Sequence, residues 1–259
     1  MISATFPAGR ESIIVFIMHA ATERLLDHFL EGVEPAVPLV ALWAHGSLAA
    51  GDYQPERSDL DLIAVLDSAP TMEHWRRIKA VHRRLRLPLA ERLHCSYLAR
   101  QELDDLAAEH ITWAHGHIFR RPVTAVTRRE LHDKPRVLYG PPPAGLLPPV
   151  SDAELTRFVR TDLRDYWLVK AQGRRRWLQD VWVDLGMLTV ARATVTLRDG
   201  RLISKREALD VLAELDAPET VVADIRARRY DTPAPVLSRF RRGRLARAFV
   251  RTAIRRALA

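Results

Sequence analysis

Two carboxylates and a glycine–serine pair are the residues of this sequence that could do chemistry together. Asp59 and Asp61 stand at the start of one apolar run, and Gly46 and Ser47 directly follow an earlier one. Side chains two apart in a strand point to the same face, so the carboxylates should lie together. They repel each other unless a cation lies between them, and Mg²⁺ binds one or two carboxylates together with substrate phosphates. The pair therefore predicts a magnesium site that works on a phosphate-containing substrate.

The glycine–serine pair supplies the other half of this chemistry. Glycine lets the backbone turn sharply, so that N–H groups at Gly46 and Ser47 can point at an anion. With the serine hydroxyl they would hold the outer phosphates of a nucleotide, while the metal bridges those phosphates during in-line attack on phosphorus. Ser58, which precedes the aspartates, would support either the turn or a ligand.

Strands and helices have to position these groups. Leu39–Ala44 and Leu60–Leu66 are apolar runs of strand length, separated by a short helical turn and a polar loop. Residues 19–31 carry apolar side chains at helical spacing, and Thr71–Leu85 predicts a second helix capped by its own threonine. Arg92–Leu98 alternates and predicts a half-buried strand. The order is strand, turn, strand, helix, strand.

The motif as a whole resembles a known family. Gly46-Ser47 followed by Arg57-Ser58-Asp59-Leu60-Asp61-Leu62 resembles the signature of the DNA-polymerase-β-type nucleotidyltransferase superfamily. Within it, the chain is most similar to aminoglycoside 3''-adenylyltransferases, which modify streptomycin and spectinomycin. The resemblance implies an α+β fold, in which a nucleotidyltransferase palm precedes a C-terminal helical bundle. It also implies Mg²⁺, ATP as co-substrate, transfer of AMP to a hydroxyl of an aminoglycoside, and antibiotic resistance.

One position departs from the resembled pattern. In those enzymes a third carboxylate on the next strand completes the metal site and deprotonates the acceptor hydroxyl, and the apolar register puts His94 there. Three interpretations stay open. His94 acts as the base, because imidazole titrates near neutral pH; or Glu91 supplies the carboxylate; or the protein is a catalytically impaired, antitoxin-like binding module.

The chain divides at a stiff Gly-Pro-Pro-Pro segment. Two β-prone runs, 124–127 and 137–139, precede it, and helical patterns follow it. A proline-rich break of this kind marks a boundary between structural units. We expect a leader over 1–18, a nucleotidyltransferase domain over 19–143 and a helical domain over 144–259.

Capping signals and apolar periodicity predict the helices of the second half. Serine followed three residues later by glutamate is a capping box, and it opens predicted helices at Ser151 and Ser204. Further helices are expected over 177–197 and 220–229. The arginine-rich segment 238–259 predicts an amphipathic final helix, which we expect to pack on the bundle.

Two cations are candidates for holding phosphates. The resemblance assigns Arg192 and Lys205 to the triphosphate and Tyr230 to the nucleotide. Independently, Arg192 lies in an apolar helix, where an unpaired charge is costly. Lys205 lies in the first turn of a helix, where a positive charge opposes the helix dipole unless an anion is present. The alternatives are an ion pair of Arg192 with Asp184 or Asp180, and a solvated position for Lys205.

The acceptor site is the least defined part. The resemblance suggests that Trp113 stacks on a sugar substrate. Asp180 and Asp184 are candidates for contacting a cationic substrate across the cleft. Leu103–His110 looks helical and acidic, and it forms either a solvated face or an acidic wall of the cleft.

Composition limits the class of protein. The chain has 259 residues, 47% of them apolar, which allows a sizeable core and excludes wholesale disorder. Its net charge of +8 attracts anions such as ATP, and its single cysteine, Cys95, cannot form an internal disulfide. The apolar run Ile13–Met18 is far shorter than the ~20 residues that span a bilayer. We expect a cytoplasmic protein with no membrane or nucleic-acid partner, and the oligomeric state stays open.

Overall fold

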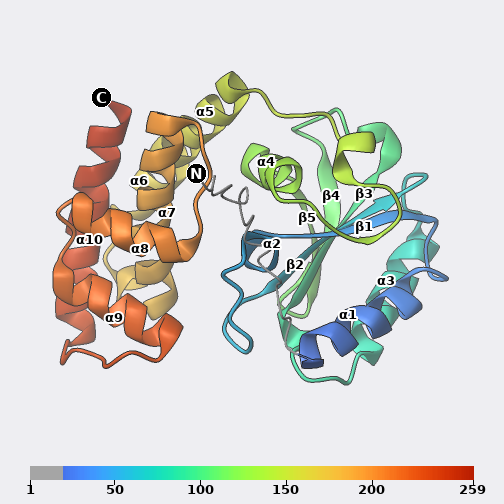
Figure 1. Ribbon diagram of the computed structural model, residues 1–259, viewed down its shortest axis with the longest axis horizontal. Helices are drawn as coiled ribbons and strands as arrows, with labels where there is room; N and C mark the ends of the chain where they lie inside the picture. Colours follow the sequence, from blue (N-terminus) through green and yellow to red (C-terminus); the bar gives the residue numbers. More distant parts are fainter. Residues whose placement is uncertain (1–19) are drawn as a thin grey trace, which may run out of the picture.

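The computed structural model describes residues 20–259 and has two parts, shown side by side in Figure 1. The sheet part (residues 20–139) carries one mixed sheet with flanking helices, and the helical part (residues 152–258) carries no strand among its described residues. The α+β fold with a C-terminal helical bundle, predicted from the sequence, is confirmed. The predicted leader, residues 1–18, lies outside the described residues.

The sheet has six strands in the order β5-β4-β3-β2-β1-β6. Only β2 and β3 pair in parallel, and the other neighbours are antiparallel. The parallel pair follows from the helix that connects its two strands, since a parallel neighbour needs a crossover. The strands are β1 (Leu39–His45), β2 (Leu60–Leu66), β3 (Leu93–Ala99), β4 (Glu109–Ala114), β5 (His117–Pro122) and β6 (Arg136–Tyr139).

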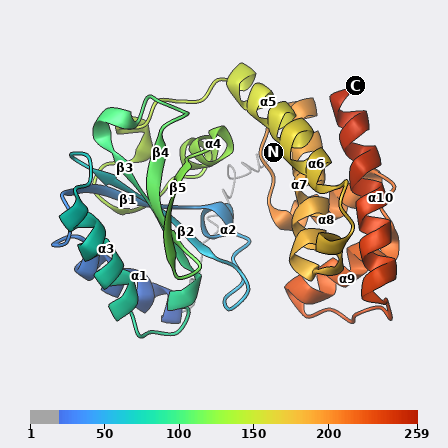
Figure 2. The same cartoon turned by 180° about the vertical axis from the view of Figure 1, so that it is seen from behind.

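Helices cover both faces of the sheet. Helices α1 (Ala20–Val33) and α3 (Met72–Arg84) pack on one face, and α4 (Ala125–Asp133) packs on the other, as Figures 1 and 2 show. The short helix α2 (Gly46–Ala50) follows β1 directly. The end of β1 and the start of β2 therefore meet beside α2, on the side that faces the helical part.

The alternation of side chains along β2 decides where its acidic residue points. Leu60, Leu62 and Ala64 pack in the apolar cluster under α1 and α3. Ile63 and Val65 pack in the cluster on the α4 face. Asp61 is two residues before Ile63, so its side chain points to the same face as Ile63 and Val65, the face covered by α4.

The helical part is a bundle built around α7, with a π-helical stretch (Asp162–Trp167) between its first two helices. Its apolar cluster joins side chains from all the longer helices, and Figure 2 shows α5, α7 and α10 lying together. None of the helices within residues 20–259 is long and apolar enough to cross a membrane. The helices are α5 (Asp152–Thr161), α6 (Leu168–Lys170), α7 (Asp180–Asp199), α8 (Lys205–Glu214), α9 (Glu219–Tyr230) and α10 (Arg239–Leu258).

The predicted helix starts are confirmed. Thr71 accepts a hydrogen bond from the N–H of His74 at the start of α3, and the capping boxes at Ser151 and Ser204 open α5 and α8. The last strand ends at Tyr139 and α5 begins at Asp152, so the predicted boundary at residues 143 and 144 falls in the connection between the two parts.

Three predicted elements are wrong. Leu103–His110 is not helical, because its end enters β4 and buries His110. Residues 124–127 begin α4 rather than a strand, with Thr124 as N-cap. Strand β3 is buried along its whole length, not half-buried, because the sheet is covered on both faces.

Candidate active site

A cleft of about 350 Å³ lies between the sheet part and the helical part. Three other cavities of the described chain are larger, but neither Asp59 nor Asp61 lines any of them. The polar residues that line the cleft are His45, Gly46, Ser47, Asp52, Asp59, Asp61, Arg121, Thr127, Glu130, Asp133 and Lys134 from the sheet part, and Arg192, Ser204 and Lys205 from the helical part.

Gly46 allows the tight approach of two strands at the floor of this cleft. Its φ is +65°, a left-handed conformation that favours glycine. A Cβ at this position would lie 3.0 Å from Oδ2 of Asp61. His45 pairs with Asp61 across the two antiparallel strands, so the turn and the carboxylate are in register. The first N–H groups of a helix have no acceptor within the helix, which makes the start of α2 a place where an anion could bind.

Asp59 and Asp61 both line the cleft, as their two-residue spacing predicts. Burial raises the pKa of Asp61, but the hydrogen bond from His94 and the charge of His45 outweigh it, and the pKa is lowered. Asp59 is more exposed and lies 3.8 Å from a guanidinium nitrogen of Arg92. Residues 20–259 contain no group of three or more metal-binding side chains. A pair of carboxylates fits Mg²⁺, which takes its other ligands from phosphates and water.

His94 lies beside Asp61, in the next strand. The parallel register pairs the two residues, and Nδ1 of His94 lies 3.5 Å from Oδ1 of Asp61. The imidazole is buried and does not line the cleft, and its Nε2 has no hydrogen-bond partner within the described chain. His94 is therefore placed to orient Asp61. Glu91, the alternative carboxylate, lines a different cavity next to Trp113.

Arg192 and Lys205 enter the cleft from the helical part. Arg192, on α7, donates to the carbonyl of Ile203 (2.9 Å) and to Glu130 (2.8 Å), not to Asp180 or Asp184. Lys205, the first residue of α8, makes no hydrogen bond or ion pair with any residue from 20 to 259. Its pKa is lowered, first by burial and then by the charge of Arg229, with Asp61 opposing. A lysine held there without a partner suits an anionic ligand.

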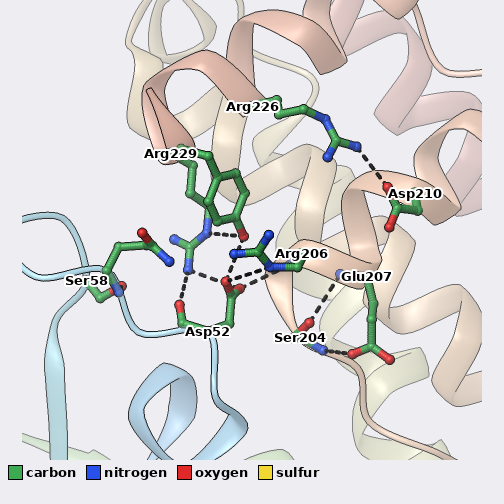
Figure 3. Close-up of polar contacts among 10 residues, drawn as sticks. Asp52, Ser58, Ser204, Arg206, Glu207, Asp210, Arg226 and Arg229 are labelled. Carbon is green, nitrogen blue, oxygen red and sulfur yellow. Dashed lines mark hydrogen bonds and ion pairs between the residues drawn. The ribbon is translucent and has the colours of Figure 1, made fainter. Parts of the chain in front are cut away.

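Asp52 joins the two parts next to this cleft. Its buried carboxylate accepts hydrogen bonds from the backbone N–H of Arg206 (3.0 Å), from Arg229 (3.2 Å) and from the hydroxyl of Tyr230 (2.7 Å), as Figure 3 shows for the labelled side chains. The N–H of Arg206 belongs to the first turn of α8. The contact therefore fixes the helix end that carries Lys205.

The structure does not bring Trp113 to the cleft. Trp113 pairs with Cys95 across β3 and β4, and Cys95 lies on the face covered by α1 and α3. Its ring stacks on His82 of α3, with centroids 4.6 Å apart. Because side chains alternate, Trp113 points to the face opposite Asp61.

Other predicted site residues have internal partners. Asp180 pairs with Arg242, and Asp184 pairs with Arg228 at 2.5 Å, so both carboxylates are held within the helical part. These two, Tyr230 and Ser58 are not among the residues that line the cleft.

Tyr230 and Ser58 each have a structural contact at the loop between α2 and β2. Tyr230 is bound to Asp52, with the guanidinium of Arg206 over its ring. Ser58 accepts from the N–H of Gln54 at 3.0 Å, which supports the loop.

Among the cleft residues that were not predicted, His45 and Glu130 contact each other. Nδ1 of His45 lies 3.3 Å from Oε2 of Glu130, and Arg192 holds the other oxygen. His45 stands directly before the glycine–serine pair, a position that could have drawn attention to it. Glu130 was missed because no helix was predicted between the two β-prone runs 124–127 and 137–139. A helix over Ala125–Asp133 with buried Arg128 and Leu131 places Glu130 on the side toward β1.

Comparison with known proteins gives a family match and a similar fold. Residues 26–140 match the family described as nucleotidyltransferase domain. The fold is similar to the crystal structure of a spectinomycin adenyltransferase, AAD(9), from Enterococcus faecialis with ATP and spectinomycin. The TM-score is 0.63 at 15% sequence identity, over 91% of this chain and 97% of that one. A search of curated proteins gave no match.

Proposed function

We propose that this chain, whose residues 26–140 form a nucleotidyltransferase domain, transfers AMP from ATP to a hydroxyl of a small molecule of the aminoglycoside class, in a Mg²⁺-dependent reaction. Nucleotidyl transfer rests on the domain, whereas the metal, the acceptor and the residue roles are the proposal. One observation carries it. Two carboxylates and a glycine–serine turn face Arg192 and Lys205 across a single cleft.

The phosphates are held from both sides in this proposal. Backbone N–H groups of Gly46 and Ser47 meet the triphosphate from the sheet part, and Lys205 and Arg192 meet it from the helical part. The backbone N–H groups and Lys205 make no contact with each other that the ligand would have to break, whereas Arg192 is paired with Glu130 before the ligand arrives. Asp52 supports this arrangement by holding the start of α8.

Asp59 and Asp61 would hold the Mg²⁺, and His94 would keep Asp61 in position. When bound, the ion neutralises charge on the phosphates and on the leaving pyrophosphate. The low pKa of Asp61 keeps it ionised at neutral pH, as a metal ligand must be. That His94 is the base remains a prediction from the sequence.

A cationic acceptor suits the remaining part of the cleft. Glu130 and Asp133 line it beside the nucleotide groups, and the similar fold was solved with ATP and spectinomycin. Carboxylates at this place would attract the ammonium groups of an aminoglycoside. Modification of such a compound in the cytoplasm, where ATP is available, would give antibiotic resistance.

A second function has one observation in its favour. Strand β3 presents His94, not a carboxylate, beside Asp61. A site impaired in this way would bind nucleotide and regulate a partner as an antitoxin-like module. It would show ATP affinity without release of pyrophosphate.

The test is transfer of label from ATP labelled at the α-phosphate, with MgCl₂ and a panel that includes spectinomycin and streptomycin. We expect labelled acceptor and pyrophosphate with the wild type, and a loss on the order of 100-fold in Asp61→Asn. Asp67→Asn, which changes an exposed aspartate just beyond β2, should transfer normally. Equal signals from the wild type and Asp61→Asn would reject the enzyme, and ATP binding without transfer would favour the module.

A further inference from the structure

Glu130 is the one cleft carboxylate contacted by basic side chains from both parts of the molecule, among the residues described. His45, at the end of β1, contacts its Oε2 at 3.3 Å, and Arg192, on α7, contacts its Oε1 at 2.8 Å. Its side chain is 18% exposed and the cleft is open to it. Glu130 therefore faces the ligand cavity while His45 and Arg192 each contact one of its oxygens, and a ligand that binds Arg192 would free one oxygen.

The site also lacks a group that the reaction needs. An acceptor hydroxyl attacks phosphorus more readily when a positioned base removes its proton. Strand β3 offers His94, which is buried and does not line the cleft, and Glu91 lines another cavity. Glu130 lines the cleft together with Asp59 and Asp61. His45 connects it to this pair, since His45 is the register partner of Asp61.

We infer that Glu130 is the general base for the acceptor hydroxyl, and that its pairing with Arg192 keeps it occupied until the nucleotide phosphates take Arg192 over. The inference rests on the proposed function, for which it supplies the base. In the step itself, the hydroxyl proton moves to a Glu130 oxygen, the acceptor oxygen bonds to the α-phosphorus, and the bond from that phosphorus to pyrophosphate breaks.

The contacts of Arg192 make the exchange feasible. Its Nε is anchored to the carbonyl of Ile203 at 2.9 Å, so the guanidinium stays at the cleft when its NH2 changes partner. A triphosphate carries several negative charges against the single charge of Glu130, and a planar guanidinium binds phosphate oxygens in pairs. Glu130 keeps its contact with His45 throughout, which preserves its orientation.

The local charges change in the direction that a base requires. Burial raises the pKa of Glu130, whereas His45 and Arg192 outweigh burial and lower it. Moving Arg192 to the triphosphate weakens the effect by which Arg192 lowers the pKa of Glu130. The carboxylate then holds a proton more strongly, which makes it a better base than it is in the free protein.

The experiment compares Glu130→Gln with Glu73→Gln, which breaks a Glu–Arg pair of 3.0 Å on exposed α3. Calorimetry measures the affinity for Mg-ATP, and transfer of labelled AMP to spectinomycin measures turnover. In Glu130→Gln we expect ATP affinity to be unchanged or up to about tenfold tighter, because Arg192 is released in advance. Turnover should fall about 100-fold or more. Glu130→Asp keeps the charge and should retain more turnover than Glu130→Gln, and Glu73→Gln should match the wild type.

The outcomes separate this inference from the proposed function. Wild-type transfer with a similar rate in Glu130→Gln would overturn the role of Glu130 and leave the proposed function in place. A tenfold weaker affinity for ATP in Glu130→Gln would also overturn it, because the glutamate would then support the nucleotide site structurally. No transfer by the wild type to any compound of the panel would overturn the proposed function, and the base with it.

Discussion

Replacing Asp52 by alanine should uncouple the sheet part from the helical part. The carboxylate of Asp52 is 4% exposed and lies 3.2 Å from Arg229, which is 11% exposed. It also accepts from Tyr230 and from the N–H of Arg206 at the start of α8. The substitution removes all these acceptors and leaves a guanidinium buried without its counter-charge.

The expected cost follows from burial. Removing one partner of a buried ion pair costs about 3–5 kcal/mol, mostly because the remaining charge is uncompensated. This is a large part of the roughly 5–15 kcal/mol that stabilises a typical domain. The matched control is Asp231→Asn, which removes the charge and keeps a residue that tolerates the left-handed conformation of this position (φ +53°). Its partner Arg57 lies in the same loop region as Asp52. The carboxylate of Asp231 is 80% exposed, and such pairs contribute about 0–1 kcal/mol.

Urea denaturation followed by tryptophan fluorescence measures the effect. For Asp52→Ala we expect the helical part and the sheet part to unfold in separate transitions, and the affinity for Mg-ATP to fall because the start of α8 loses its anchor. Asp231→Asn should keep the wild-type curve. If both variants lose the same small free energy, the buried Asp52 cluster does not couple the two parts, and the reasoning is refuted.

Three further predictions concern other parts of the molecule. Lys205→Met should weaken Mg-ATP binding in calorimetry by about 10- to 100-fold, since it removes a charged contact worth about 1.5–3 kcal/mol; unchanged affinity would remove Lys205 from the site. Gly243→Ala should destabilise the bundle by about 1–3 kcal/mol in urea, because its Cβ would lie 2.1 Å from the carbonyl oxygen of Trp177, whereas Gly173→Ala meets nothing within 4 Å and should cost far less. Burial lowers the pKa of His82 to about 3, so the unfolded chain binds a proton below pH 6.5 that the folded chain does not. Stability from this group is complete above pH 6.5 and falls by up to about 1.4 kcal/mol per pH unit toward pH 4, and a His82→Gln variant with an unchanged slope would contradict this.

The parts of the fold that sequence patterns predicted are those set by local rules. The strand over Leu60–Leu66 is apolar throughout, and the two-residue period places Asp59 and Asp61 on one face without knowledge of the tertiary structure. The helix starts at Thr71 and Ser151 could be predicted because each capping side chain accepts a hydrogen bond from a backbone N–H only three residues later.

The parts that were missed depend on long-range packing. Trp113 was expected near the acceptor, but pairing with Cys95 sets its face, and this register cannot be read from the local sequence. His45 and Glu130 are 85 residues apart and meet only because α4 packs on β1. The start of α4 has threonine and valine like a strand, yet it is helical, with Thr124 as its N-cap. Arg128 of this helix is buried and donates to backbone carbonyls including that of Asp105, a contact between distant segments.

The central claim is that Asp59 and Asp61 gather a divalent cation together with the triphosphate. Electron paramagnetic resonance with Mn²⁺ in place of Mg²⁺ measures it directly, by counting the ion that becomes bound when ATP is added. We expect ATP-dependent binding of Mn²⁺ to the wild-type protein and a loss of at least about tenfold in affinity in Asp61→Asn, since a coordinating charge is removed. Equal ATP-dependent binding of Mn²⁺ by both proteins would contradict the account.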